Sequence, residues 1–353
     1  MPQNMESRNS LETDNRLAQL HDWLGTLPGE LGLVTESLRP ASSDASFRRY
    51  FRIDSRDGTA IIMDAPPERE DCRPFLHVGE RLAQAGLHVP EILSQDLDKG
   101  FLLLSDLGSH TFYQALMEGL DEATLHILYR PALSALVRLQ QARSDDLPAY
   151  DGKRLRDELS VFREWYVEQH HQAQLSATEA SALEEVFATL TADNAAQPTV
   201  LVHRDYHSPN LMVPGTAGDE PGIIDFQDAV AGPITYDIAS LSMDARYTWE
   251  EDRQLDWTIR YWEMARAAGL PVGHDFAAFH RAYEWMSLQR NLRVLGVFVR
   301  LSRRDGKHHY LDHIPRVNAY VRQVAGRYGA FRPLMRLLDR LDGVQPVNPL
   351  EPA

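Results

Sequence analysis

The sequence is poor in cysteine and has no long hydrophobic run. Cys72 is the single cysteine among 353 residues, which excludes a disulfide framework and a zinc site built from cysteines. No apolar stretch approaches the roughly 20 residues that a membrane-spanning helix needs. The first fifteen residues are polar and mixed in charge, without the apolar segment of a secretory signal. We therefore expect a cytoplasmic protein that does not enter a membrane.

Basic residues are in the minority. The chain carries 51 acidic and 36 basic residues, which gives a formal net charge of -15. A field of this sign repels the nucleic-acid backbone, so we expect no nucleic-acid partner. Nothing in the sequence points to an obligate protein partner, and a small molecule is the expected ligand. Lysine is especially scarce, because the basic residues include only Lys99, Lys153 and Lys307.

The spacing of apolar residues predicts an α+β fold with two lobes. Residues 11–27 and 72–85 have the period of amphipathic helices, and alternating patterns predict strands at 32–39, 45–54, 59–64, 91–96 and 101–104. Beyond residue 106, candidate helices dominate, at 111–119, 121–142, 154–171 and 177–193 and again from residue 235, apart from a β-rich stretch at 199–224. We therefore expect a small β-rich lobe over 1–105 and a larger helical lobe over 106–353. A cleft between two such lobes is a common place for a ligand.

The most specific motif lies in that β-rich stretch. Residues 202–212 read Val-His-Arg-Asp-Tyr-His-Ser-Pro-Asn-Leu-Met, and residues 223–228 read Ile-Ile-Asp-Phe-Gln-Asp. The pattern resembles the catalytic and metal segments of the protein-kinase-like superfamily, and most closely the aminoglycoside phosphotransferase family. The resemblance implies ATP as the phosphate donor. Asp205 would orient the attacking hydroxyl and accept its proton, while Asn210 and Asp225 would supply the oxygen ligands that Mg²⁺ prefers.

Two neighbouring residues are expected to support the loop. His203 is predicted to pack and hydrogen-bond within the loop, and the resemblance implies that Asp237 accepts hydrogen bonds from the loop backbone. No activation segment with an Ala-Pro-Glu motif follows Asp225, which argues against a protein kinase.

The resemblance also implies the residues of the nucleotide site. They are the phosphate-covering loop at Ser43, Asp44, Ser46 and Arg48, the connector at Ser105, Asp106 and Leu107, and the apolar residues Ile61, Met212 and Ile224 on the adenine faces. The loop is rich in serine where protein kinases have glycine, and hydroxyl and backbone N–H groups can bind phosphate oxygens there.

One position departs from the family pattern. Kinases carry a lysine on the third strand that holds the α- and β-phosphates, whereas this strand has Met63. Either the protein is an inactive relative or an arginine replaces that charge. We favour replacement by Arg48, Arg49 or Arg52, because the base and both metal ligands are retained. Glu80 is the candidate for the helix glutamate that normally pairs with the lysine.

Three segments narrow the resemblance to one branch of the family. The stretches that begin at Ser43, Met63 and His203 look like the bacterial kinases that phosphorylate the anomeric hydroxyl of N-acetylmuramate and N-acetylglucosamine during peptidoglycan recycling. Besides Asp205, the candidate contacts to the sugar are Gln227, Asp228 and Arg290. Arg290 belongs to a polar run at 289–293 that could bind the lactyl carboxylate, although a solvated helix face is the simpler interpretation of that run.

Other functions remain open from the sequence alone. An aminoglycoside-type antibiotic kinase would need carboxylates around its polycationic acceptor, and the net charge does not localise them. A choline- or homoserine-type kinase would share the loop but not the three segments. A nucleotide-binding module without transfer activity is supported by Met63 alone.

Overall fold

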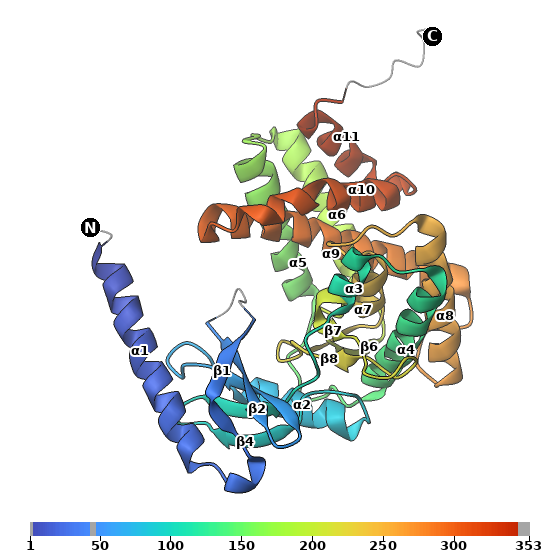
Figure 1. Cartoon of the computed structure of the whole chain (residues 1–353). Coiled ribbons are helices and arrows are strands. Elements are labelled where there is room, and N and C mark those ends of the chain that lie inside the picture. The colour runs from blue at the N-terminus through green and yellow to red at the C-terminus, as the bar shows by residue number, and fades with distance from the viewer. Residues whose placement is uncertain (1–2, 43–46, 345–353) are drawn as a thin grey trace, which may run out of the picture.

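The N-terminal part of the chain is an antiparallel sheet with a helix on each face (Figure 1). The computed structural model describes residues 3–42 and 47–344. Helix α1 (Gln3–Thr26) and the 3-10 turn η1 (Gly29–Leu31) precede the sheet, and α2 (Arg73–Gln84) is inserted between its third and fourth strands. The strands lie in the order β1-β2-β3-β5-β4 and are β1 (Val34–Ser42), β2 (Arg49–Ser55), β3 (Gly58–Asp64), β4 (Ile92–Asp96) and β5 (Phe101–Ser105).

A tight hairpin sets the register of β2 and β3. Ser55 pairs with Gly58, so only Arg56 and Asp57 form the loop, and Gly58 has a φ of 131° that disfavours residues with a side chain. From this turn the ladder continues without a bulge to the pair Arg49–Asp64. Because side chains alternate across a strand, this register decides which residues of β2 and β3 face the cleft.

The two faces of the sheet are buried against different partners. On one face α1 packs with Leu20 and Trp23 against Ile62 and Phe101, and the rings of Trp23 and Phe101 stack at 5.5 Å. On the other face Met63 joins the core that includes α2 and the helical lobe. The sheet is therefore a fixed platform whose second face forms one wall of the cleft.

The rest of the chain is mainly helical. Its helices are α3 (Phe112–Glu118), α4 (Glu122–Gln141), α5 (Gly152–Val161), the π-helix η2 (Phe162–His170), α6 (Ala177–Ala195), α7 (Tyr236–Ser242), α8 (Glu251–Ala267), α9 (Phe276–Asp305), α10 (Ile314–Ala325) and α11 (Arg332–Leu341), with 3-10 turns η3 (Ser208–Asn210), η4 (His308–His313) and η5 (Gly329–Phe331). Short strands β6 (Thr199–Val202) and β9 (Val230–Pro233) pair with each other, as do β7 (Leu211–Met212) and β8 (Gly222–Ile223).

Local sequence signals start several of these helices. The Thr111 and Ser176 side chains form capping boxes with Gln114 and Glu179 at α3 and α6, and Asp121 caps α4. The helix predicted at 154–171 is instead divided into α5 and the π-helix η2. The backbone hydrogen-bonding pattern changes between these two elements, and apolar periodicity does not reveal such a change.

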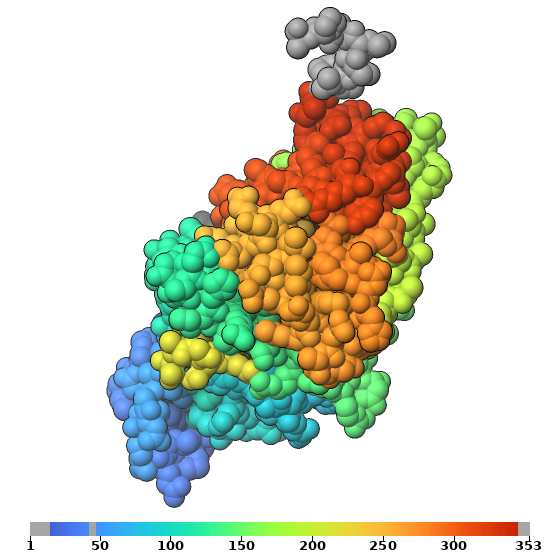
Figure 2. Space-filling model, turned by 90° about the vertical axis from the view of Figure 1, so that its right-hand side faces the viewer, coloured from blue at the N-terminus to red at the C-terminus, as the bar shows by residue number. Residues whose placement is uncertain are grey.

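Helix α9 crosses the helical lobe and packs very closely against α5. A Cβ added to Gly296 would lie 2.3 Å from the carbonyl oxygen of Val161, so only glycine allows this approach. Figure 2 shows the chain as an elongated body, with the blue N-terminal region at one end and the red C-terminal helices at the other. The antiparallel sheet and the helical remainder confirm the predicted α+β fold.

We propose residue 105 as the boundary between the lobes, since β5 ends at Ser105 and the next helix begins at Phe112. Within the described part of the chain, no helix is both long and apolar enough to cross a membrane.

Candidate active site

The loop around Asp205 is anchored through its backbone. The N–H groups of His203 and Arg204 donate to the two carboxylate oxygens of Asp237, at 2.7 and 3.0 Å. The His203 ring donates from Nε2 to the carbonyl oxygen of Ile224 at 3.1 Å and accepts the Asp205 N–H at Nδ1, at 3.3 Å. These contacts require neutral His203, and burial lowers the pKa of this histidine. The predicted supporting roles of His203 and Asp237 are confirmed.

Two non-glycine residues of the site have a left-handed backbone. Arg204 has a φ of 76° and Asp225 a φ of 65°. Such conformations are uncommon outside glycine and concentrate at functional sites, where surrounding contacts hold them. At Asp225 the support comes from Phe226, whose ring stacks on Phe75 at 4.9 Å and lies against Gly79 of α2. Helix α2 therefore helps to fix the position of the Asp225 carboxylate.

The structure brings the three predicted catalytic and metal residues together. The Asn210 side chain donates from Nδ2 to the backbone oxygen of Asp205 at 3.0 Å and lies 3.4 Å from Asp225 Oδ2. Gln227 donates from Nε2 to Asp225 Oδ1 at 2.8 Å. Because Nδ2 of Asn210 is committed to the loop backbone, its Oδ1 remains as a ligand atom beside the Asp225 carboxylate. This pair of oxygen donors fits Mg²⁺.

Asp205 is held in its charged form. Burial raises the pKa of this carboxyl, but the nearby side chains of His207, Arg293 and Arg290 outweigh burial and lower the pKa below its usual value. His207 follows in the same loop, and burial lowers its pKa to about 4, so this histidine is neutral at pH 7 and the charges that keep Asp205 ionised there belong to the arginines. Asp205 is thus an ionised carboxylate that can accept a hydrogen bond from a substrate hydroxyl.

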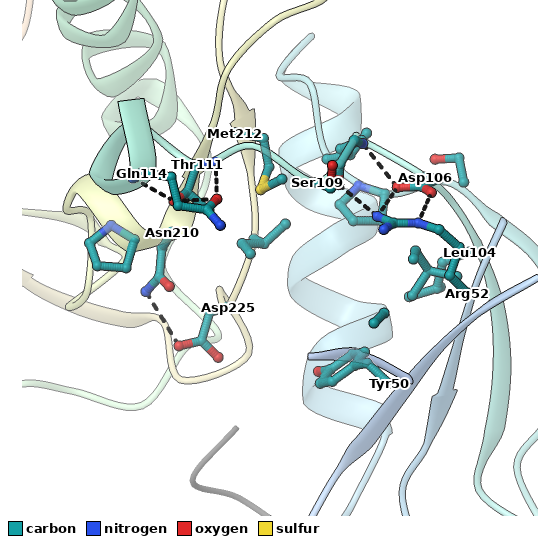
Figure 3. A pocket seen from close by; sticks show the side chains of 18 of the residues that line it. Tyr50, Arg52, Leu104, Asp106, Ser109, Thr111, Gln114, Asn210, Met212 and Asp225 are labelled. Carbon is teal, nitrogen blue, oxygen red and sulfur yellow. Dashed lines mark hydrogen bonds and ion pairs between the residues drawn. The ribbon is translucent and has the colours of Figure 1, made fainter. Parts of the chain in front are cut away.

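A cavity of about 660 Å³ lies between the lobes and reaches Asn210 and Asp225 (Figure 3). It is lined by six of the predicted nucleotide-binding residues, namely Ile61, Ser105, Asp106, Leu107, Met212 and Ile224. Sequence reasoning missed Tyr50, Phe75, Thr111 and Gln114, which also line it. Arg48 does not line the cavity, and Ser43, Asp44 and Ser46 fall outside the described residues. Figure 3 shows Asn210 and Asp225 on one side of this cavity and Asp106 of the connector on the other.

The connector is fastened to the sheet by Asp106. Arg52 donates to both carboxylate oxygens of Asp106, at 2.6 and 3.0 Å, and the Thr59 hydroxyl donates to Oδ2 at 2.6 Å. Burial raises the pKa of Asp106, but these donors outweigh burial and lower it. The Asp106 side chain is therefore occupied by protein contacts.

Met63 is buried in the core, and the three candidate arginines lie in different places. Arg49 and Arg16 bind the buried Asp64 on the α1 face of the sheet. Arg52 lines the cavity but is held by the connector. Arg48, just before β2, lies 3.2 Å from Glu70.

The helix glutamate expected to pair with a strand lysine does not face this region. Glu80 is exposed and accepts a hydrogen bond from Gln84. The prediction for Glu80 is therefore wrong, because α2 turns Val78 and Gly79, and not Glu80, toward the core.

The polar run on α9 is buried, so its interpretation as a solvated helix face is wrong. Gln289 donates to the carbonyl oxygen of Leu155 at 2.9 Å, which makes it a link between helices. Arg290 and Arg293 instead act on Asp205. Of the other two candidate sugar contacts, Gln227 donates a hydrogen bond to Asp225, whereas Asp228 is exposed to solvent.

Glu158 of α5 belongs to this site and was missed by the sequence reasoning. Its Oε1 atom lies 3.3 Å from both Arg204 and Arg293, and its other oxygen accepts a hydrogen bond from Tyr150. Glu158 is more than forty residues from the catalytic loop, and no motif marks it.

Comparison with known proteins agrees with this geometry. A family model described as "Phosphotransferase enzyme family" matches residues 37–276. An N-acetylmuramate/N-acetylglucosamine kinase of Pseudomonas putida is 43% identical over 338 residues, covering 94% of this chain and 98% of the relative. A protein of the same description from Neisseria meningitidis is 43% identical over 330 residues, covering 93% of this chain and 96% of the relative.

Solved structures match over most of the chain. An aminoglycoside phosphotransferase with bound ADP has a TM-score of 0.57 at 13% identity, covering 88% of this chain and 98% of that one. A choline/ethanolamine kinase family protein from Mesorhizobium loti has a TM-score of 0.59 at 13% identity, covering 92% and 99%. These matches confirm the predicted kinase-like two-lobe fold. From its family model, its relatives and its fold, the chain belongs to the phosphotransferase enzyme family.

Proposed function

We propose that this protein is an ATP-dependent kinase that phosphorylates the anomeric hydroxyl of N-acetylmuramate and N-acetylglucosamine, a step in peptidoglycan recycling. The observation that carries the proposal is the 43% identity, over 94% of the chain, to a kinase described by these two sugars. A cytoplasmic location is part of the proposal, because the phosphate donor ATP is available there.

The catalytic step follows from the geometry around Asp205. The carboxylate would accept a hydrogen bond from the C1 hydroxyl of the sugar, orient its oxygen toward the γ-phosphate and take up its proton. An anomeric hydroxyl is more acidic than an ordinary alcohol, which suits a base whose pKa is lowered. The anchored loop keeps Asp205 in place, since its backbone is tied to Asp237 and His203.

Asn210 and Asp225 are the proposed holders of Mg²⁺. Bound there, the ion would neutralise charge on the phosphate oxygens. Gln227 would keep the Asp225 carboxylate in its orientation through the 2.8 Å hydrogen bond. The connector at Ser105–Leu107 and the apolar residues Ile61, Met212 and Ile224 are proposed to hold the adenine.

The charge around Asp205 argues against a polycationic acceptor. The charges of Arg204, Arg290 and Arg293 lower the pKa of this carboxylate, and they would repel a polycationic aminoglycoside. The proximity of the proposed base Asp205 to the proposed metal ligands Asn210 and Asp225 supports an active enzyme over an inactive nucleotide-binding module.

The test is phosphate transfer from labelled ATP with Mg²⁺ to N-acetylmuramate, N-acetylglucosamine, kanamycin and choline, each offered separately. We expect phosphorylation of the two sugars, with the phosphate located at C1 by NMR. Transfer to kanamycin alone would establish antibiotic modification instead. ATP binding without transfer to any acceptor would support a nucleotide-binding module.

A further inference from the structure

Arg290 is a buried cation on α9 with two unpartnered nitrogens. The residue is only 2% exposed, and its Nε and Nη1 atoms are buried without a hydrogen-bond partner among the described residues. Burying a guanidinium is costly unless an anion compensates its charge. This position is therefore suited to an anion that arrives with a ligand.

Arg293 lies one helical turn from Arg290, and the spacing places both on the same side of α9. Its Nε atom is 3.3 Å from Glu158, and its side chain is 18% exposed, so it is accessible to a ligand. Glu158 also lies 3.3 Å from Arg204. Arg204 and Arg293 thus share one glutamate, and two nitrogens of Arg290 have no partner among the described residues, so the region beside Asp205 holds more arginines than carboxylates in a protein whose net charge is -15.

The positive region lies beside Asp205, the proposed base for the acceptor hydroxyl, and outside the nucleotide pocket. Arg290 and Arg293 both act electrostatically on Asp205 and on Tyr236, whose hydroxyl is also buried without a partner among the described residues. Neither arginine lines the cavity between the lobes that contains the predicted nucleotide-binding residues. An anion bound here would belong to the acceptor and not to ATP.

We propose that Arg290 and Arg293 bind the carboxylate of the acceptor and thereby favour N-acetylmuramate over N-acetylglucosamine. The inference rests on the proposed function. The two sugars share the 2-acetamido ring and differ in the lactyl ether at C3, which carries the carboxylate. One ring atom separates C1 from C3, so an acceptor whose C1 hydroxyl meets Asp205 also holds its lactyl group nearby. A guanidinium matches the planar geometry of that carboxylate.

The test compares the two sugars on the same enzyme. In Arg293→Gln and Arg290→Gln we expect kcat/KM for N-acetylmuramate to fall roughly 10- to 100-fold more than for N-acetylglucosamine, as for the loss of a charge-assisted hydrogen bond. Arg290→Lys keeps the charge and should restore part of the preference. The matched control is Arg304→Gln on the same helix, where the arginine is bound to Asp305; its sugar preference should equal that of the wild type.

The methyl ester of N-acetylmuramate provides a second measurement. It keeps the shape of the lactyl group and removes the charge, so wild-type enzyme should lose affinity for the ester relative to the acid, whereas Arg293→Gln should treat both alike. If the variants lose activity equally on both sugars, the arginines act on Asp205 or on the phosphoryl group, and the inference is overturned. Wild-type enzyme that phosphorylates neither sugar overturns the proposed function and this inference with it. Because Arg293 is partly exposed, its variant tests the idea even if Arg290→Gln does not fold.

Discussion

His203 and Asp237 are joined by a 2.7 Å hydrogen bond in which the backbone N–H of the histidine donates to the carboxylate. The other carboxylate oxygen accepts the N–H of Arg204, whose φ of 76° needs external support. Asp237 is fully buried on α7, a helix far along the chain from the catalytic loop. The position of Asp205 therefore depends on a residue that contacts neither substrate nor metal in the proposed mechanism.

Asp237→Asn should lower kcat while leaving ATP affinity nearly unchanged. The amide keeps one acceptor oxygen but turns a donor NH₂ toward the second backbone N–H, which leaves buried donors unpaired at a cost of about 1–3 kcal/mol. We expect a lower melting temperature and a slower turnover, measured by calorimetry and by steady-state kinetics. A variant with normal turnover would show that Asp237 does not position the loop.

The raised pKa of Asp237 predicts that the effect of this substitution on stability depends on pH. Burial raises the pKa of Asp237 to about 6, above the ordinary value of 3.8, so the folded state binds this proton more tightly than the unfolded state. The stabilisation of the folded state by protonated Asp237 is fully present below pH 3.8 and is lost as the pH rises through 6. A difference of roughly two pKa units corresponds to about 3 kcal/mol. The destabilisation by Asp237→Asn should therefore be larger at pH 4 than at pH 7, measured by denaturant unfolding; a constant difference would contradict the shift.

Asp205→Asn should abolish most phosphate transfer without unfolding the protein. A positioned base contributes roughly 10²- to 10⁴-fold to the rate, and the asparagine cannot take up the proton of the hydroxyl. ATP binding should persist, because Asp205 does not line the nucleotide cavity. The measurements are kcat and the ATP dissociation constant on the same preparation. Retention of more than a tenth of wild-type turnover would exclude Asp205 as the base.

Arg48 is our candidate for the charge that replaces the strand lysine, because it belongs to the segment expected to cover the phosphates and its ion pair with Glu70 ties it neither to the connector nor to Asp64. Arg52 is bound to Asp106 at the connector, and Arg49 is bound to Asp64 on the opposite face of the sheet. Arg48→Ala should raise the KM for ATP roughly 10-fold, the effect of losing a charged phosphate contact.

Arg49→Ala is the matched control for this change. It should leave the KM for ATP within about twofold and lower the melting temperature, because it weakens the pairing of a buried carboxylate. If Arg48→Ala leaves the KM unchanged, or if Arg49→Ala raises it, the assignment to Arg48 is wrong.

The sequence predicted most of the fold because the signals are local. Alternating apolar residues located the strands, as on both sides of the hairpin between Ser55 and Gly58, and apolar periodicity located helices such as the one predicted at 72–85. The π-helical form of residues 162–170 was not predictable, since apolar spacing does not distinguish the two hydrogen-bonding patterns.

For the site, the sequence located the residues that share one motif and missed those brought in by packing. Asp205, Asn210 and Asp225 lie on a loop and just after an adjoining strand, and the motif that resembles the kinase-like family indicated that they meet. Glu158 reaches the site from α5, and its partner Arg293 lies in a run whose polar composition suggested solvent. Burial of such a run depends on how α9 packs against α5, which one sequence does not show.

Gly296→Ala should be severely destabilising, because this packing has no room for a methyl group. The added carbon would lie 2.3 Å from the Val161 carbonyl oxygen, a backbone atom that cannot move without shifting α5. Overpacking a core commonly costs about 1–3 kcal/mol, and here the backbone contact places the effect at the upper end.

Gly25→Ala is the control for this change, since Gly25 lies in α1 and nothing is within 4 Å of its added Cβ. Alanine should leave that helix unchanged or stabilise it slightly. Unfolding free energies of the two variants check the prediction. Any surviving Gly296→Ala activity should show a weakened preference for N-acetylmuramate, because Arg293 is carried on the displaced helix; unchanged stability would mean that α9 and α5 are less closely packed than the structure shows.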